Sequence, residues 1–250
     1  MSTIRLSSGI TPNYLGRATR FIESIKKHLN VPALIFAFDF PDDTKDVLGV
    51  PCVAAPYSRC SLNLPKFMAQ NGAFVDFVPA DWKEDDVVIF TDADAYFQRP
   101  FTDDELVAFA AVKPGQFLGS YNMPNEPQSL LSEAGDLFPK KPMAEIEREF
   151  PGMAGMATVN WGFIVARLDS WRELHKRTVA LWPTVDACFG NPARVQLACI
   201  YAASQPALEI GKLPPLTHHH AHRGLKEGLS KNSDGDWVFM GEKICFAHAL

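Results

Sequence analysis

The chain has 250 residues, of which 47% are apolar, which is enough for one sizeable α/β core and fits a single domain better than two. Its formal net charge of -5 and the absence of any run of Lys and Arg argue against duplex nucleic acid as a partner. Five widely spaced cysteines without a CxxC pair, and no apolar run of the roughly 18 to 20 residues that a transmembrane helix needs, indicate a cytoplasmic protein without a transmembrane segment.

The first part of the chain alternates apolar strands with an amphipathic helix. A short apolar stretch at 4–6 leads into a predicted turn at 7–13, and residues 14–29 carry apolar side chains at helical spacing. The run ALIFAFDF at 33–40 predicts a strand buried on both faces, and 51–57 is a weaker strand candidate. Buried strands that alternate with helices predict a central, mostly parallel sheet flanked by helices.

The most β-prone run is VVIF at 87–90, which follows a helical stretch near 62–71. The sequence TDADAYF at 91–97 leaves the carboxyl end of this strand, where open α/β sheets bind their ligands. The later predictions are strands at 116–121, 159–167 and 243–248, helices near 170–182 and 192–204, and an irregular segment at 122–155.

Two carboxylates separated by one residue, Asp92 and Asp94, follow the strand at 87–90. On an extended backbone they face the same side and can share one divalent ion. Oxygen ligands suit Mg²⁺ or Mn²⁺, and such an ion can neutralise the phosphates of a bound nucleotide. The alternative interpretation is that the two acidic residues cap the next helix or line a solvated turn.

The segment VVIFTDADAYFQRPF at 87–101 resembles the strand-DxD-aromatic segment of GT-A glycosyltransferases. The opening strand, turn and helix are similar to the donor-base pocket of such enzymes, and VNWGFIVAR at 159–167 resembles their Asn-x-Gly segment. The closing GEKICFAHAL at 241–250 looks like the metal-histidine strand of glycosyltransferase family 8 and its relatives. Two departures from family 8 are the missing Lys-Pro-Trp after that histidine and Arg194-Val195-Gln196 where an Asp-Gln pair is common.

The resemblance implies a GT-A-like enzyme that transfers a hexose from a nucleoside diphosphate-sugar, with a UDP-sugar expected, to a hydroxyl acceptor. It implies a donor nucleotide and metal half at 1–100, and an acceptor half with the metal-histidine strand at 101–250. Retention of anomeric configuration is implied by the resemblance alone. No carboxylate in the acceptor half is marked out as a base, and no motif indicates the acceptor or an oligomeric state.

His248 is expected as the third metal ligand beside Asp92 and Asp94, because the last apolar strand can carry it back to the aspartates. An imidazole ligand suits Mn²⁺ better than Mg²⁺. The alternatives are a histidine bonded to a backbone carbonyl, or His220 or His222 in its place. The cluster of His218, His219, His220 and His222 is predicted to lie in a loop, with a role on the substrate side for one of them.

Further donor-site candidates lie near the first and third strands: Thr11, Asn13, Tyr14, Arg17, Arg59 and Lys66. Tyr14 would stack on the base and Arg17 would pair with phosphate oxygens, whereas the alternative is an ordinary helix start with Thr11 as N-cap. Arg59 and Lys66 would face the diphosphate-sugar, or be ordinary basic residues of a helix face.

The sugar pocket has four candidates, which are Asn160, Trp161, Gly162 and Gln196. Gly162 would let the backbone approach the ligand, and Gln196 would face the reaction centre from its helix. Trp161 in the core and Gln196 in solvent are the alternatives.

Two other functions fit the same elements. A nucleotidyltransferase acting on a sugar-1-phosphate shares the layout and the metal aspartates, but SSGITPNYLGR lacks the repeated glycines of its phosphate loop. A non-catalytic nucleotide- or sugar-binding domain of the same fold is the other alternative.

Overall fold

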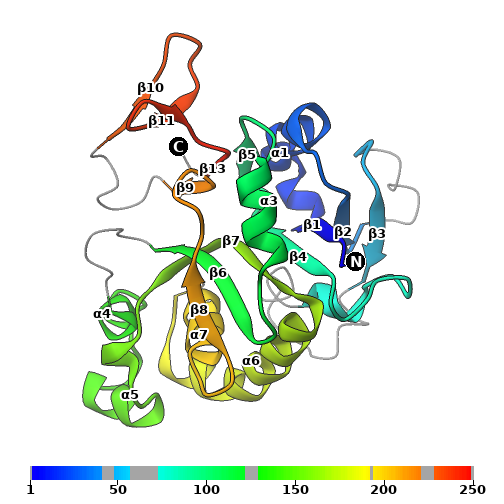
Figure 1. The fold of residues 1–250 in the computed structure, drawn as a ribbon. Helices are drawn as coiled ribbons and strands as arrows, with labels where there is room; N and C mark the ends of the chain where they lie inside the picture. Colours follow the sequence, from blue (N-terminus) through cyan, green and yellow to red (C-terminus); the bar gives the residue numbers. More distant parts are fainter. Residues whose placement is uncertain are drawn as a thin grey trace.

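A seven-stranded sheet with the strand order β3-β2-β1-β4-β7-β6-β8 forms the centre of the computed structural model, which describes residues 2–40, 48–56, 73–121, 129–191, 194–220 and 228–248 (Figure 1). Its strands are β1 (Ile4–Ile10), β2 (Ala33–Phe38), β3 (Cys52–Ala55), β4 (Val87–Thr91), β6 (Gln116–Tyr121), β7 (Val159–Arg167) and β8 (Glu209–Lys212). Within it, β7 runs antiparallel to both neighbours, and all other pairs are parallel. The predicted α/β class with a mostly parallel sheet is confirmed.

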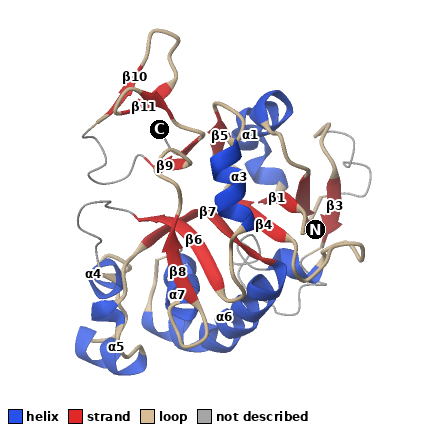
Figure 2. Ribbon diagram, in the orientation of Figure 1, coloured by secondary structure: helices blue, strands red, loops and turns tan. Residues whose placement is uncertain are grey.

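Helices cover both faces of this sheet (Figure 2). They are α1 (Leu15–His28), α3 (Asp103–Ala110), α4 (Leu130–Gly135), α5 (Met143–Glu149), α6 (Leu168–Cys188) and α7 (Arg194–Ala203). One core layer packs α1 and α3 on the sheet through residues such as Phe21 and Phe109, and the other packs α4, α6 and α7 through residues such as Trp171. The sheet is therefore buried on both faces, which explains its continuous apolar strands.

Two small sheets hold the last part of the described chain. One has the order β5 (Ala95–Phe97), β13 (Phe246–His248) and β9 (His218–His220), and the other is formed by β10 (Leu229–Lys231), β11 (Trp237–Phe239) and β12 (Glu242–Lys243). Strand β13 is central in its sheet, antiparallel to β5 and parallel to β9. The segment that leaves the aspartates is thereby joined directly to the segment that carries His248.

Several element predictions were wrong in detail. The first strand runs on to Ile10 and includes part of the predicted turn. The segment 122–155 contains α4 and α5, residues 218–220 form a strand rather than a loop, and the predicted strand 243–248 is two strands, β12 and β13. The predicted helix near 62–71 lies outside the described residues.

A register shift in the central sheet prepares the site. Between Gly119 and Ser120 of β6 the partner on β7 changes from Ile164 to Asn160, so β7 bulges over the intervening residues. A bulge changes which side chains face a given side of a sheet. Asn160, Gly162 and Phe163 consequently all reach the side on which β13 and β9 lie.

Candidate metal and donor site

Asp92 and Asp94 lie at the carboxyl end of β4, where the buried strand VVIFT ends and the chain turns into β5. The Asp92 backbone N–H donates to the Gly162 carbonyl at 3.0 Å. Pairing of β13 with β5 sets His248 opposite Ala95, next to Asp94. One ligand atom from each of Asp92, Asp94 and His248 lies within 4.8 Å of the others, and these three residues are called the metal cluster below.

The imidazole of His248 has a defined orientation. Asn160 Oδ1 accepts a hydrogen bond from the Gly162 backbone N–H at 2.9 Å, which identifies this atom as the amide oxygen. His248 Nδ1 lies 3.2 Å from the same oxygen and must therefore donate to it. Nε2 then faces the carboxylates, 3.1 Å from Asp94 Oδ1 and 3.7 Å from Asp92 Oδ2. This is the arrangement of a metal-binding histidine whose other nitrogen is held by an outer partner.

Gly162 leaves room for this ring. A Cβ at position 162 would lie 2.3 Å from His248 Cε1 and 2.4 Å from His248 Nδ1. Since real Cβ atoms do not approach so closely, only glycine lets the backbone of β7 lie directly against the imidazole.

The charged groups of the metal cluster shift one another's pKa values. Burial raises the pKa of Asp92, and the charge of Asp94 adds to this while His248 opposes it. For Asp94 burial acts in the same direction, but hydrogen bonds from His248 and Tyr14 outweigh it and hold the pKa below its usual value. Burial works against a charged His248, yet contact with Asp94 and the charge of Asp92 leave its pKa raised.

The metal cluster fits a divalent cation. Both aspartate side chains keep more than a third of their surface exposed, so their oxygens are accessible, whereas the His248 side chain is 7% exposed. Two hard oxygen donors and one imidazole form a mixed set suited to Mn²⁺. Asp92, Asp94 and His248 are the residues that would hold such a cation.

Residues at the start of α1 reach the same place. Tyr14 Oη donates to Asp94 Oδ2 at 3.0 Å, and the Arg17 guanidinium lies 5.5 Å from the centre of the Tyr14 ring. Burial and the charge of Asp94 raise the pKa of Tyr14, which therefore stays a donor. Thr11 precedes the first turn as expected, but its hydroxyl donates to Asn13 Oδ1 at 2.7 Å and caps no backbone N–H.

The sugar-pocket candidates are divided between two sides of β7. Trp161 is 2% exposed and packs in the core against Phe117 and Trp171. Gln196 is partly exposed; its Oε1 accepts from the Trp161 backbone N–H at 3.3 Å and its Nε2 donates to Glu133 Oε1 at 2.9 Å. Glu133, a carboxylate that is 9% exposed, was missed because nothing in the sequence near α4 links it to Gln196.

The remaining candidates are not all described. Arg59, Lys66 and His222 lie outside the described residues. His218 lies in β9, and its ring is 5.7 Å from that of His248. Its contact with the metal cluster depends on the pairing of β9 with β13, which the histidine-rich pattern does not predict.

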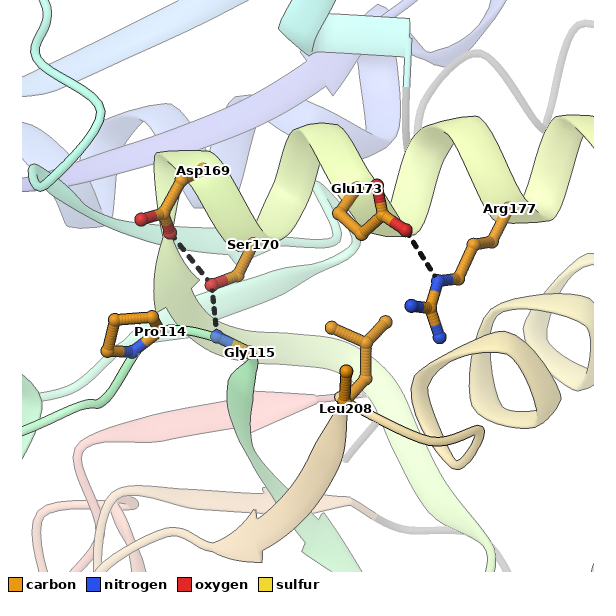
Figure 3. A pocket seen from close by; sticks show the side chains of 8 residues that line it. Pro114, Gly115, Asp169, Ser170, Glu173, Arg177 and Leu208 are labelled. Atoms are coloured by element: carbon orange, nitrogen blue, oxygen red, sulfur yellow. Dashed lines mark hydrogen bonds and ion pairs between the residues drawn. The ribbon is translucent and has the colours of Figure 1, made fainter.

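A pocket of about 320 Å³ lies away from this site (Figure 3). Ser170 Oγ accepts from the Gly115 N–H at 2.8 Å and donates to Asp169 at 2.9 Å, while Arg177 pairs with Glu173 at 2.8 Å. Asp169 follows the end of β7, whereas Asn160 is near its start. This pocket therefore lies at the opposite end of β7 from the metal cluster.

Among solved structures, the chain is similar to the galactosyltransferase LgtC in complex with donor and acceptor sugar analogs. The TM-score is 0.59 at 8% sequence identity, and the match covers 98% of this chain and 86% of that chain. This likeness confirms the predicted GT-A-like fold. No protein-family model and no curated protein sequence matches the chain. Among the described residues, no helix combines the length and the apolar character that crossing a membrane requires.

Proposed function

We propose that the chain is a metal-dependent glycosyltransferase that transfers a hexose from a nucleoside diphosphate-sugar, with a UDP-sugar as the expected donor, to a hydroxyl acceptor. The observation that carries this proposal is the metal cluster of Asp92, Asp94 and His248 at the carboxyl end of β4 in a GT-A-like fold. Asp92, Asp94 and His248 would hold Mn²⁺ or Mg²⁺. A divalent ion in this position supplies charge stabilisation for a departing diphosphate.

The donor half is assigned to residues 1–100. Tyr14 holds Asp94 through its hydroxyl and offers its ring to the nucleobase, and Arg17 beside it offers a guanidinium to the phosphates. Thr11 and Asn13 complete the turn that would face the ribose, and Arg59 and Lys66 stay assigned to the diphosphate.

The acceptor half is assigned to residues 101–250. Asn160 and Gly162 hold His248, so their proposed contact with the donor is indirect. Gln196 accepts a hydrogen bond from the backbone N–H of Trp161, the residue between Asn160 and Gly162. Its side-chain amide donates a second hydrogen bond to Glu133. We assign this amide and carboxylate pair to the sugar side of the site, with retention of configuration expected from the family resemblance.

A panel of nucleotide-sugars with Mn²⁺, read by release of the nucleoside diphosphate, tests the reaction class. Asp92→Asn or Asp94→Asn should lower metal-dependent donor turnover by at least about 100-fold, because each removes a key charge-stabilising contact. Asp104→Asn, an exposed carboxylate of α3, is the matched control and should keep full turnover. Near-normal turnover in both folded site variants would contradict the proposal.

The same assay separates the two alternatives. Turnover of a sugar-1-phosphate with a nucleoside triphosphate would identify a nucleotidyltransferase instead. Binding of a nucleotide-sugar without any metal-dependent turnover would identify a non-catalytic domain.

A further inference from the structure

A second imidazole is packed against the metal cluster. His218 is 3% exposed, and its ring is roughly parallel to those of Phe163, with centroids 5.5 Å apart at 21°, and His248, with centroids 5.7 Å apart at 26°. The ring of Phe246 also lies beside His218, with the two ring centroids 5.7 Å apart. The His218 ring thus adjoins both Phe163, which belongs to the apolar core of the large sheet, and His248 of the metal cluster.

The orientation of His218 is fixed by Ser120. The Ser120 hydroxyl has one hydrogen, which it donates to the His218 carbonyl oxygen at 3.1 Å. It must then accept from His218 Nδ1, also at 3.1 Å, so Nδ1 carries a hydrogen. Ser120 reaches His218 because it follows the register shift in β6.

Burying an imidazole at this position costs free energy, because its polar nitrogens lose their hydrogen bonds to water. Phe163 and Phe246 already form an apolar wall there, and a hydrocarbon side chain would not need a hydrogen-bond partner. The hydrogen bond to the Ser120 hydroxyl holds the His218 ring in one orientation, so the ring is not free to turn over by 180°. Its flat face is therefore presented to His248 at a fixed tilt.

The ring of His248 is surrounded by four groups, of which His218 is one. The backbone at Gly162 lies against one side of the His248 ring, Asn160 holds Nδ1, Asp94 lies beyond Nε2, and His218 covers a ring face. Without the His218 ring, the imidazole of His248 could rotate about its Cβ–Cγ bond and tilt Nε2 away from the carboxylates.

We propose that His218, oriented by Ser120, is a positioning residue that fixes the ring of His248 for metal binding. This inference rests on the proposed metal site and names the residues that preorganise it. His218 contacts neither ion nor substrate in this role; it acts through His248, as outer-shell partners of metal-bound histidines do.

Titration of the full chain with Mn²⁺ alone, followed by calorimetry or by the electron paramagnetic resonance signal of free Mn²⁺, tests the proposal without any sugar donor. His218→Ala should weaken Mn²⁺ binding by about 10- to 100-fold, the usual effect of removing an outer-shell partner. Ser120→Ala, a milder change at a half-buried position, should give a smaller loss of up to about 10-fold.

His175→Ala is the matched control, because His175 is also a buried histidine, 8% exposed, but lies on α6 and pairs with Asp76. This variant should lower the melting temperature and leave the Mn²⁺ affinity unchanged. All titrations are made well below the melting temperature of every variant, so that a loss of affinity is not a loss of folded protein.

Unchanged Mn²⁺ affinity in folded His218→Ala and Ser120→Ala would overturn the positioning role while leaving the proposed function standing. A wild-type chain that binds Mn²⁺ but turns over no nucleotide-sugar would overturn the proposed function alone, and the variants would still decide the positioning role. A wild-type chain that binds no Mn²⁺ would overturn both.

Discussion

Gly162 is the residue on which the position of His248 depends most directly. We predict that Gly162→Ala weakens Mn²⁺ binding by about 100-fold, because its Cβ would overlap the imidazole and force it away from the aspartates. Calorimetric titration with Mn²⁺ measures this. Gly155→Ala is the control, since a Cβ at Gly155 meets no atom within 4 Å and should change nothing. Equal affinity in Gly162→Ala and wild type would show that the ring does not need this backbone approach.

At the residue scale, the sequence indicated which residues belong to the site better than it indicated which residues contact one another. Asp92 and Asp94 were recognisable because they follow the most β-prone run of the chain. Asn160 was also singled out, but its hydrogen bond to His248 spans 88 residues, and no local pattern encodes that partner. The alternation of a strand shows which side chains share a face, and the bulge in β7 breaks that alternation where it matters for the site.

Among the elements, the end of β5 and the start of α3 form a clamp on the C-terminal segment. Glu105 pairs with Arg99 at 2.7 Å and accepts from the Thr217 hydroxyl at 2.9 Å, and it completes the N-terminal capping box of α3 with Thr102. Arg99 also donates to the Lys243 carbonyl at 2.9 Å. The clamp thereby ties the segment after β5 to Thr217, just before β9, and to Lys243 in β12.

We predict that Glu105→Gln lowers the free energy of unfolding by about 3 kcal/mol at pH 7, because it leaves the guanidinium of Arg99 largely buried without its charge partner. Urea unfolding measures this difference. Glu173→Gln is the control, because the pair of Glu173 with Arg177 is more exposed to solvent than the pair of Glu105 with Arg99, and it should cost less than about 0.5 kcal/mol.

The effect of Glu105→Gln should depend on pH. Burial raises the pKa of Glu105, but Arg99, the Thr102 N–H and the Thr217 hydroxyl together leave it below its usual value. The stabilisation is therefore present above the unfolded-state pKa of about 4.3 and is lost as the pH falls through the lower folded-state pKa. The difference between wild type and variant should shrink on acidification below about pH 4. A difference that stays constant down to pH 3 would rule out the ionised carboxylate as its cause.

At the element scale, strands with long apolar runs were predicted well, and 159–167 matches β7 at both ends. Short elements were not. Strand β9 is three residues of histidine, which has no strand preference of its own, and it forms because β13 lies beside it. Helices α4 and α5 have only six and seven residues, too few for a periodic pattern to stand out.

Across the whole molecule, the metal cluster joins the connection between β4 and β5 to β13, near the end of the described chain, so metal binding should stabilise the folded chain as a unit. At 100 times its dissociation constant, Mn²⁺ should add about 2.7 kcal/mol. For a chain of this size that corresponds to a rise in melting temperature of about 5 to 10 °C. Thermal unfolding with Mn²⁺ and with a chelator measures the rise, which should be absent in His248→Ala. An equal rise in that variant would place the stabilising ion elsewhere.

The pairing of β13 with β5 also has a consequence for the order of folding. Contacts such as that between Cys245 and the Arg99 carbonyl close a loop of 146 residues, whereas β1, β2 and β3 pair between near neighbours in the chain. Since the entropy of closing a long loop is lost before its contacts form, the small sheet should assemble after the large one. Weakening β13 should then speed unfolding and leave the folding rate nearly unchanged. The ability to bind metal would be the last property that a refolding chain regains.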